Sequence, residues 1–140
     1  MKYLVLLFSV LVNFVIFSQD TANIEKEIFN KINNYRVKIG KSKFTYTNTM
    51  VSSCRSHSSY MNSIWTLVHV KSLSEVGANA EIIQLNTTMG STDAEVGTSV
   101  LDIFIKSPSH KKIIEGNYKQ ISVGVFVTSD DDLWVTIRFI

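Results

Sequence analysis

Two apolar segments at the carboxyl end, residues 121–127 and 133–139, constrain the fold more than any other feature of the sequence. A short polar segment separates them, so we expect a β-hairpin. Side chains alternate between the two faces of a strand, which places Val123 on one face and Phe126 on the other. Because both faces are apolar, the sheet needs cover on both sides. The sequence therefore predicts an α+β domain, a three-layer α/β/α sandwich with a central antiparallel sheet.

Helical patterns supply the covering layers. One apolar stripe predicts a helix over residues 21–39, and a second helix is expected after Asn48. Thr92 and Glu95 have the spacing of a capping box, which opens a third helix. Pro108 is typical of a first helical position and predicts a fourth, short helix. The first stripe consists of Ile24, Ile28, Ile32, Tyr35 and Ile39.

The amino end has the pattern of an export signal. Lys2 gives a positive start, residues 3–17 are almost all apolar, and Ser18 begins a small, polar stretch. We expect a signal peptide over residues 1–18 and a single domain over residues 19–140. The alternative is an uncleaved anchor, but the run is short of the about 20 apolar residues that span a bilayer. Cleavage would leave a secreted or periplasmic protein with no stable membrane span.

Composition limits the chemistry. The chain has one cysteine, Cys54, so no intrachain disulfide can form. Lysine and arginine number 14 against 12 aspartates and glutamates, a formal net charge of +2. No basic stripe accompanies this balance, so nucleic acid is not an expected partner. The open alternatives are a small molecule, a lipid or an extracellular protein.

Five short motifs follow one another along the chain, and their order and spacing resemble the CAP superfamily. This superfamily comprises the cysteine-rich secretory, antigen 5 and pathogenesis-related proteins, and the likeness is greatest to its bacterial SCP-like extracellular branch. The resemblance covers residues 24 to 139 and implies the same α/β/α sandwich. The motifs are Asn34-Tyr35-Arg36 with Gly40, His57-Ser58 with Met61, Ala80-Glu81-Ile82, Ser107-Pro108-Ser109-His110-Lys111, and Val123-Gly124-Val125.

The resemblance also implies a cleft built from His57, Glu81 and His110. Some members of the superfamily bind zinc or another divalent ion there, with His57 and His110 as the possible metal ligands of this chain. Two imidazoles and a carboxylate would leave an open position for water or a ligand. The residues themselves add one argument, because His110 lies in a first helical turn, where the positive helix end favours a neutral imidazole.

The chain departs from the superfamily pattern where a GENIA motif is expected. We place its glutamate at Glu81, with Glu75 as a possible substitute. The second acidic residue of the cleft has no clear counterpart, and Asp102 or Glu95 could approach the site. His69 matches a histidine that the bacterial branch carries between two of the motifs, and it ranks below His57 and His110 as a candidate.

The leading functional hypothesis is a binding module for a ligand or a divalent metal ion, with no established catalytic activity. A metal-assisted hydrolase or peptidase, with Glu81 as the catalytic base, is the first alternative. A lipid- or sterol-binding protein, which would use apolar surface away from the histidines, is the second. Whether the chain is an enzyme stays open at this stage.

Overall fold

A computed structural model describes residues 20–140. The predicted signal peptide, residues 1–18, lies outside the described residues. The predicted α+β architecture is confirmed: four α-helices and a four-stranded sheet make up the described part of the chain. The helices are α1 (Thr21–Lys38), α2 (Val51–Ser63), α3 (Asp93–Lys106) and α4 (Pro108–Ile114), with a short 3-10 helix, η1 (Ser74–Val76), between α2 and the next strand.

The four strands form one mixed sheet in the order β1-β3-β4-β2. The expected hairpin is present, and β2 joins β4 in antiparallel pairing. One detail differs from the predicted antiparallel sheet, because the short β1 pairs with β3 in parallel. Two residues give too little periodicity for a sequence pattern to reveal such a strand. The strands are β1 (Thr45–Tyr46), β2 (Ala80–Thr87), β3 (Gln120–Val127) and β4 (Asp132–Phe139).

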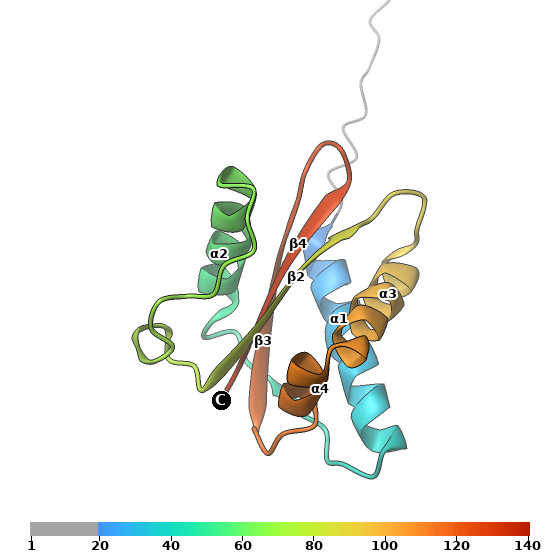
Figure 1. The fold of residues 1–140 in the computed structure, drawn as a ribbon. Coiled ribbons are helices and arrows are strands. Elements are labelled where there is room, and N and C mark those ends of the chain that lie inside the picture. Colours follow the sequence, from blue (N-terminus) through green and yellow to red (C-terminus); the bar gives the residue numbers. More distant parts are fainter. Residues whose placement is uncertain (1–19) are drawn as a thin grey trace, which may run out of the picture.

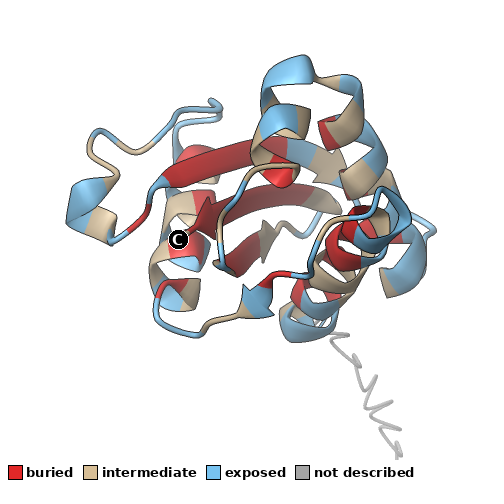
Figure 2. Ribbon diagram, turned by 90° about the horizontal axis from the view of Figure 1, so that it is seen from below, coloured by how far each residue is buried: buried red, intermediate tan, exposed pale blue. Residues whose placement is uncertain are grey.

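Helices cover both faces of the sheet, as Figure 1 shows: α2 lies on one side, and α1, α3 and α4 lie on the other. The central strands are accordingly buried along most of their length (Figure 2). The main hydrophobic core lies between the sheet and α1 and α3, where Ile24, Ile28 and Ile32 have no exposed surface. The apolar stripe of the first predicted helix therefore faces the sheet at these three positions, whereas its last member, Ile39, lies beyond the end of α1 and is 39% exposed.

A close approach of α2 to β3 explains one of the motif glycines. A Cβ atom on Gly124 would lie 2.4 Å from the backbone nitrogen of Arg55 and 2.4 Å from the Cβ of Cys54. No side chain fits between the strand and the helix at this point, so a glycine in β3 is required for α2 to pack against the sheet.

Arg36 joins three parts of the chain beside the C-terminal end of α1. Its guanidinium donates to the carbonyl oxygens of Ser42, Ile114 and Gly116 at 2.6–3.0 Å and stacks on the ring of Phe44, 3.7 Å from the centroid. Only 4% of this residue is exposed. The first motif therefore has a structural role, which is to hold α4 and the strand β1 region to α1.

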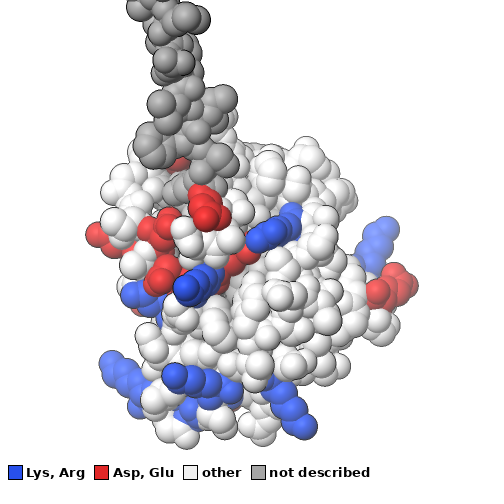
Figure 3. All heavy atoms as spheres, turned by 180° about the vertical axis from the view of Figure 1, so that it is seen from behind, with Lys and Arg blue, Asp and Glu red and all other residues white. Residues whose placement is uncertain are grey.

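The back face of the molecule carries basic side chains at its lower end and a mixture of acidic and basic side chains above them (Figure 3). Its charge is thus not of one sign over the whole face. Among the helices of residues 20–140, none is both long and apolar enough to cross a bilayer.

Candidate functional site

Glu81, near the start of β2, is the centre of a buried polar cluster. Arg138 of β4 lies directly opposite it in the antiparallel pair, and opposite residues point to the same face of a sheet. The Nε of Arg138 donates to Oε2 of Glu81 at 2.8 Å, and its Nη1 donates to the hydroxyl of Ser53 in α2 at 2.8 Å. Both charged side chains are only 1% exposed. The ion pair therefore lies between the sheet and α2.

The second carboxylate oxygen of Glu81 faces the loop that follows α2. Oε1 accepts from the backbone N–H of Val70 at 3.0 Å and from Nδ1 of His69 at 3.0 Å. Burial by itself would raise the pKa of Glu81, but the hydrogen bonds from Val70, Arg138 and His69 outweigh it and lower the pKa below its ordinary value of 4.5. Glu81 is thus ionised at neutral pH, and both of its oxygens are engaged.

His69 is held by this carboxylate in one orientation. An ionised carboxylate can only accept, so Nδ1 of His69 carries the hydrogen in the bond to Glu81. In a neutral imidazole this leaves Nε2 with a free lone pair. The side chain is 58% exposed, which makes Nε2 accessible to a ligand. The arrangement is the one by which a carboxylate orients a ligand-binding histidine in many proteins.

His57 of α2 lies on the buried side of the same cluster. Its Nε2 is 2.7 Å from the carbonyl oxygen of Val68 and 3.9 Å from Oε1 of Glu81. A carbonyl oxygen accepts, so Nε2 is the protonated nitrogen. The side chain is only 10% exposed. His57 therefore anchors the loop at Val68, next to His69, which Glu81 orients.

His110 stands apart from these contacts. Its ring packs edge-on against Phe104, with 5.2 Å between centroids. Burial, followed by the charge on nearby His69, lowers the pKa of His110 below its ordinary value of 6.5. The sequence predicted a neutral His110 because of its position in a first helical turn. The lowered pKa agrees with that prediction, but its causes are burial and a neighbouring histidine. Among the described residues, no hydrogen bond or ion pair joins His110 to Glu81 or His57.

Three of the residues singled out in the sequence, His57, His69 and Glu81, thus meet in one cluster. Within residues 20–140, His110 makes no hydrogen bond or ion pair with them, but a charge on His69 acts on its pKa. The other acidic candidates lie elsewhere. Glu75 and Asp102 are exposed, and Glu95 completes the capping box of α3 with Thr92. Sequence reasoning missed Arg138, although a single charged residue inside an apolar strand was a signal that a buried partner exists.

The donor set does not form a complete metal site. Within residues 20–140, no three histidine, cysteine, aspartate or glutamate side chains converge in a metal-ligand group. Zinc in proteins usually has three or four protein ligands. Both oxygens of Glu81 are occupied, and the Nε2 of His57 faces a carbonyl. The predicted combination of His57, Glu81 and His110 therefore does not fit zinc as a three-ligand set in this geometry.

Solved structures of known proteins share this fold at low sequence identity. An outer surface protein of Borrelia burgdorferi superposes with a TM-score of 0.68 at 18% identity, over 86% of this chain and 94% of that one. An extracellular protein of Bacillus anthracis that contains an SCP domain gives 0.62 at 16%, over 84% of this chain and 41% of that one. NaASP2, crystallised with Zn²⁺, gives 0.60 at 7%, over 84% and 78%.

The sequence comparisons identify the family. No curated protein sequence matches this chain. The family model described as the cysteine-rich secretory protein family, CAP, matches residues 29–139, which include His57, His69, Glu81 and His110. This chain therefore belongs to the CAP family.

Proposed function

We propose that this CAP domain is an extracellular binding module, which holds its ligand through His69 and His110. His57 and Glu81 act as positioning residues behind them. The observation that carries the proposal is the hydrogen bond from Nδ1 of His69 to buried Glu81, because it turns the other ring nitrogen outward. A buried carboxylate with three donors is a rigid support for an exposed imidazole.

An extracellular location has two sources of support. The sequence predicts an export signal over residues 1–18. Two proteins of the same fold are described as an outer surface protein and an extracellular protein. We propose that this chain works outside the cytoplasm, either secreted or in a periplasm.

The chemistry of the two imidazoles suggests the class of ligand. Burial, followed by the repulsion that a protonated His69 exerts, lowers the pKa of His110 below its ordinary value of 6.5, which favours the neutral ring at neutral pH. Neutral imidazoles accept hydrogen bonds and bind divalent transition metals. NaASP2 was crystallised with Zn²⁺. For this chain we propose that any such ion is held by His69, His110 and water, and is bound more weakly than at a three-ligand site.

Binding is favoured over hydrolysis by the state of Glu81. A general base needs a free lone pair directed at the proton that it removes. In this structure Oε1 accepts from Val70 and His69, and Oε2 accepts from Arg138. These donors stabilise the ionised carboxylate and reduce its basicity. A hydrolase that uses Glu81 as its base would first have to release these bonds.

Zinc titration tests the proposal. We expect calorimetry to show saturable binding of about one Zn²⁺ per chain, lost in the His69→Ala/His110→Ala double variant. Glu75→Ala is the control, since Glu75 is exposed in the same loop. Equal zinc affinity in the double variant, or no zinc binding by the unaltered protein, would contradict a shared site at these two histidines.

A second candidate function, lipid binding, has one specific observation in its favour. The end of α2 and the loop after it expose an unusual number of large apolar side chains, directly before His69. Sedimentation with phosphatidylcholine vesicles would test it: we expect Trp65→Ser to reduce any vesicle binding, whereas the two histidine substitutions would not. The exposed apolar side chains of this segment are Tyr60, Ile64, Trp65, Leu67 and Val68, with 37–62% of each residue exposed.

A further inference from the structure

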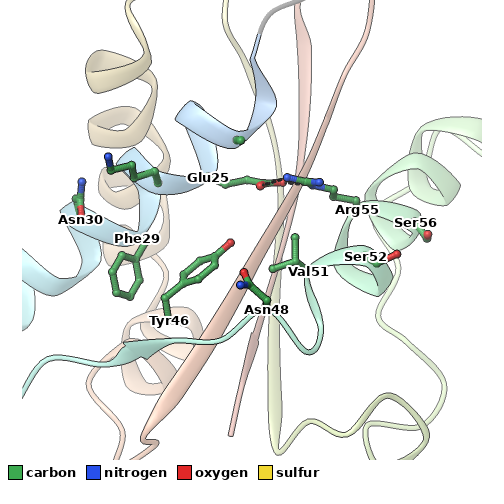
Figure 4. A pocket seen from close by; sticks show the side chains of 11 residues that line it. Glu25, Phe29, Asn30, Tyr46, Asn48, Val51, Ser52, Arg55 and Ser56 are labelled. Atoms are coloured by element: carbon green, nitrogen blue, oxygen red, sulfur yellow. Dashed lines mark hydrogen bonds and ion pairs between the residues drawn. The ribbon is translucent and has the colours of Figure 1, made fainter.

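A groove separate from the histidine cluster lies between the first turns of α1, the segment after β1 and the start of α2. It encloses about 750 Å³. This volume is in the range of small-molecule sites. Figure 4 shows Glu25 and Arg55 at one end of it and the rings of Phe29 and Tyr46 at the other. The cluster at Glu81 contributes no residue to its lining.

The groove exists because β1 is short. Its two residues pair with Gln120 and Ile121, so the edge of β3 beyond Ile121 has no neighbouring strand. Side chains take the place of the missing strand: the N–H of Val125 donates to Oε1 of Glu25 at 3.1 Å, and the hydroxyl of Tyr46 donates to the carbonyl of Val123 at 3.4 Å. The carboxylate of Glu25 is thereby fixed at the floor of the groove.

Glu25 in turn holds Arg55 in a defined position. Nε of Arg55 donates to Oε1 at 2.7 Å and Nη2 donates to Oε2 at 2.5 Å, which is a bidentate pair. The Glu25 side chain is 3% exposed, whereas that of Arg55 is 44% exposed. A guanidinium has five N–H donors. Within residues 20–140, nothing accepts from Nη1 of Arg55, so this edge of the planar group is available to a ligand.

The rest of the lining supplies a second cation, amide donors and an apolar wall. Lys26 and Arg55 give two positive charges against the one negative charge of Glu25, which the ion pair neutralises. Asp20 accepts from the N–H of Ala22 at the start of α1 and lies outside the lining, but its negative charge also acts on Arg55. The wall is a pair of rings, Phe29 and Tyr46, packed edge to face at 5.2 Å, with the amides of Asn30 and Asn48 on either side.

We propose that this groove binds the carboxylate of a small ligand with an aromatic or apolar body, such as the free carboxyl end of a peptide that terminates in an aromatic residue. The Nη1 edge of Arg55 receives the carboxylate, because a held guanidinium matches its planar geometry. Lys26 adds charge, and the ligand's apolar part lies against Phe29 and Tyr46. The site shares no lining residue with the histidine cluster.

The test uses one protein and two probes that differ only in their terminal group. N-acetyl-L-phenylalanine carries the carboxylate, and N-acetyl-L-phenylalaninamide replaces it with a neutral amide. By backbone NMR of the full chain, we expect saturable shifts at Glu25 and Arg55 with the acid. The amide should bind about tenfold more weakly or worse, since a charged hydrogen bond contributes about 1.5–3 kcal/mol. Equal affinity for the two probes would overturn the proposal, as would no saturable binding of the acid.

Variants then locate the site. Arg55→Lys keeps a positive charge beside Glu25 but removes the planar fork, and we expect it to weaken acid binding about fivefold or more. Lys38→Ala, on an exposed position at the far end of α1, is the matched control and should bind as the unaltered protein does. If Lys38→Ala loses as much affinity as Arg55→Lys, or if the shifts appear at His69 instead, the proposal is wrong. If Arg55→Lys does not fold, the comparison of the acid with the amide on the unaltered protein still tests the proposal.

Discussion

Glu81 shows how much of a site can depend on one buried side chain. Its carboxylate accepts hydrogen bonds from Arg138 in β4 and from His69 and the N–H of Val70 in the loop after α2. A buried charge is tolerated only when it is paired and hydrogen-bonded. One of the bonds that satisfy this carboxylate also fixes the imidazole of His69. Glu81 therefore contributes both to the stability of the fold and to the orientation of a candidate ligand-binding residue.

Replacing Glu81 should therefore be costly. In Glu81→Gln the guanidinium of Arg138, 1% exposed, would lose its counter-charge. Breaking a buried pair by removing one partner lowers the free energy of unfolding by about 3–5 kcal/mol. Urea unfolding followed by circular dichroism measures the difference. Glu75→Gln, at an exposed position, is the control and should change stability by less than about 0.5 kcal/mol. A loss of similar size in both variants would contradict the role of the pair.

The acid sensitivity of the fold follows from the same residue. The folded state lowers the pKa of Glu81 below its ordinary value of 4.5, so the unfolded chain binds a proton more readily. The stabilisation from Glu81 is thus fully present above pH 4.5 and is lost as the pH falls through the lowered pKa. Thermal unfolding at a series of pH values checks this. We expect Glu81→Gln to lose less stability below pH 4.5 than the unaltered protein, and an identical pH dependence would contradict it.

The sequence pointed to His57, His69, His110 and Glu81 as candidate site residues. His69 ranked below His57 and His110, yet it is the exposed partner of Glu81. The reason is physical, because the segment between α2 and β2 has no periodic pattern. Among the bonds that hold it are those from His57 to the carbonyl of Val68 and from the N–H of Val70 to Glu81, and neither bond leaves a local signal in the sequence.

For the helices and strands, the sequence predictions agree best with the structure where the sequence pattern is strong. The first helix was expected over residues 21–39 and is Thr21–Lys38, and the capping box at Thr92 opens α3 as predicted. Asn48 does not cap α2; the helix starts after Met50, which makes no side-chain cap bond. Residues 81–85 lie within β2, where pairing with β4 along the full strand decides the conformation.

Two glycines make a matched test of how these elements pack. Gly124→Ala would place Cβ 2.4 Å from backbone and Cβ atoms of α2, which cannot move without shifting the helix. We expect a loss of about 3 kcal/mol in unfolding free energy. At Gly97 in α3, a Cβ would meet the backbone of Glu27 at 3.0 Å, and the gain in helix propensity of about 1 kcal/mol offsets a small shift. Gly97→Ala should therefore be near neutral in urea unfolding. Equal losses of stability in both variants would contradict the conclusion that the close approach of α2 to β3 requires a glycine at position 124.

The whole molecule is held together by packing on both faces of its sheet, without covalent cross-links. Its one cysteine lies in α2, and Cys54 has no exposed surface. The predicted sandwich follows from the apolar faces of β3 and β4, which the helices of both layers cover. What the sequence could not supply was the groove at the edge of β3, because it depends on where the short β1 ends.

Cys54 reports on the integrity of this packing. Burial raises the pKa of its thiol to about 12, and the thiolate is the reactive form. We expect the native protein to react with a thiol reagent such as DTNB far more slowly than the urea-unfolded chain. A reducing agent should leave the melting temperature unchanged, since the chain has no second cysteine to pair with. Rapid labelling of the native protein would contradict a closed interface between α2 and β3.

The orientation of His69 by Glu81 can be tested through the tautomeric state of the histidine rings, read from long-range ¹H–¹⁵N NMR spectra at neutral pH. We expect neutral His69 to be protonated on Nδ1, with Nε2 free for a ligand, and His57 to be protonated on Nε2. Finding the hydrogen of His69 on Nε2 would contradict it, because Glu81 would then not be orienting the ring toward the solvent.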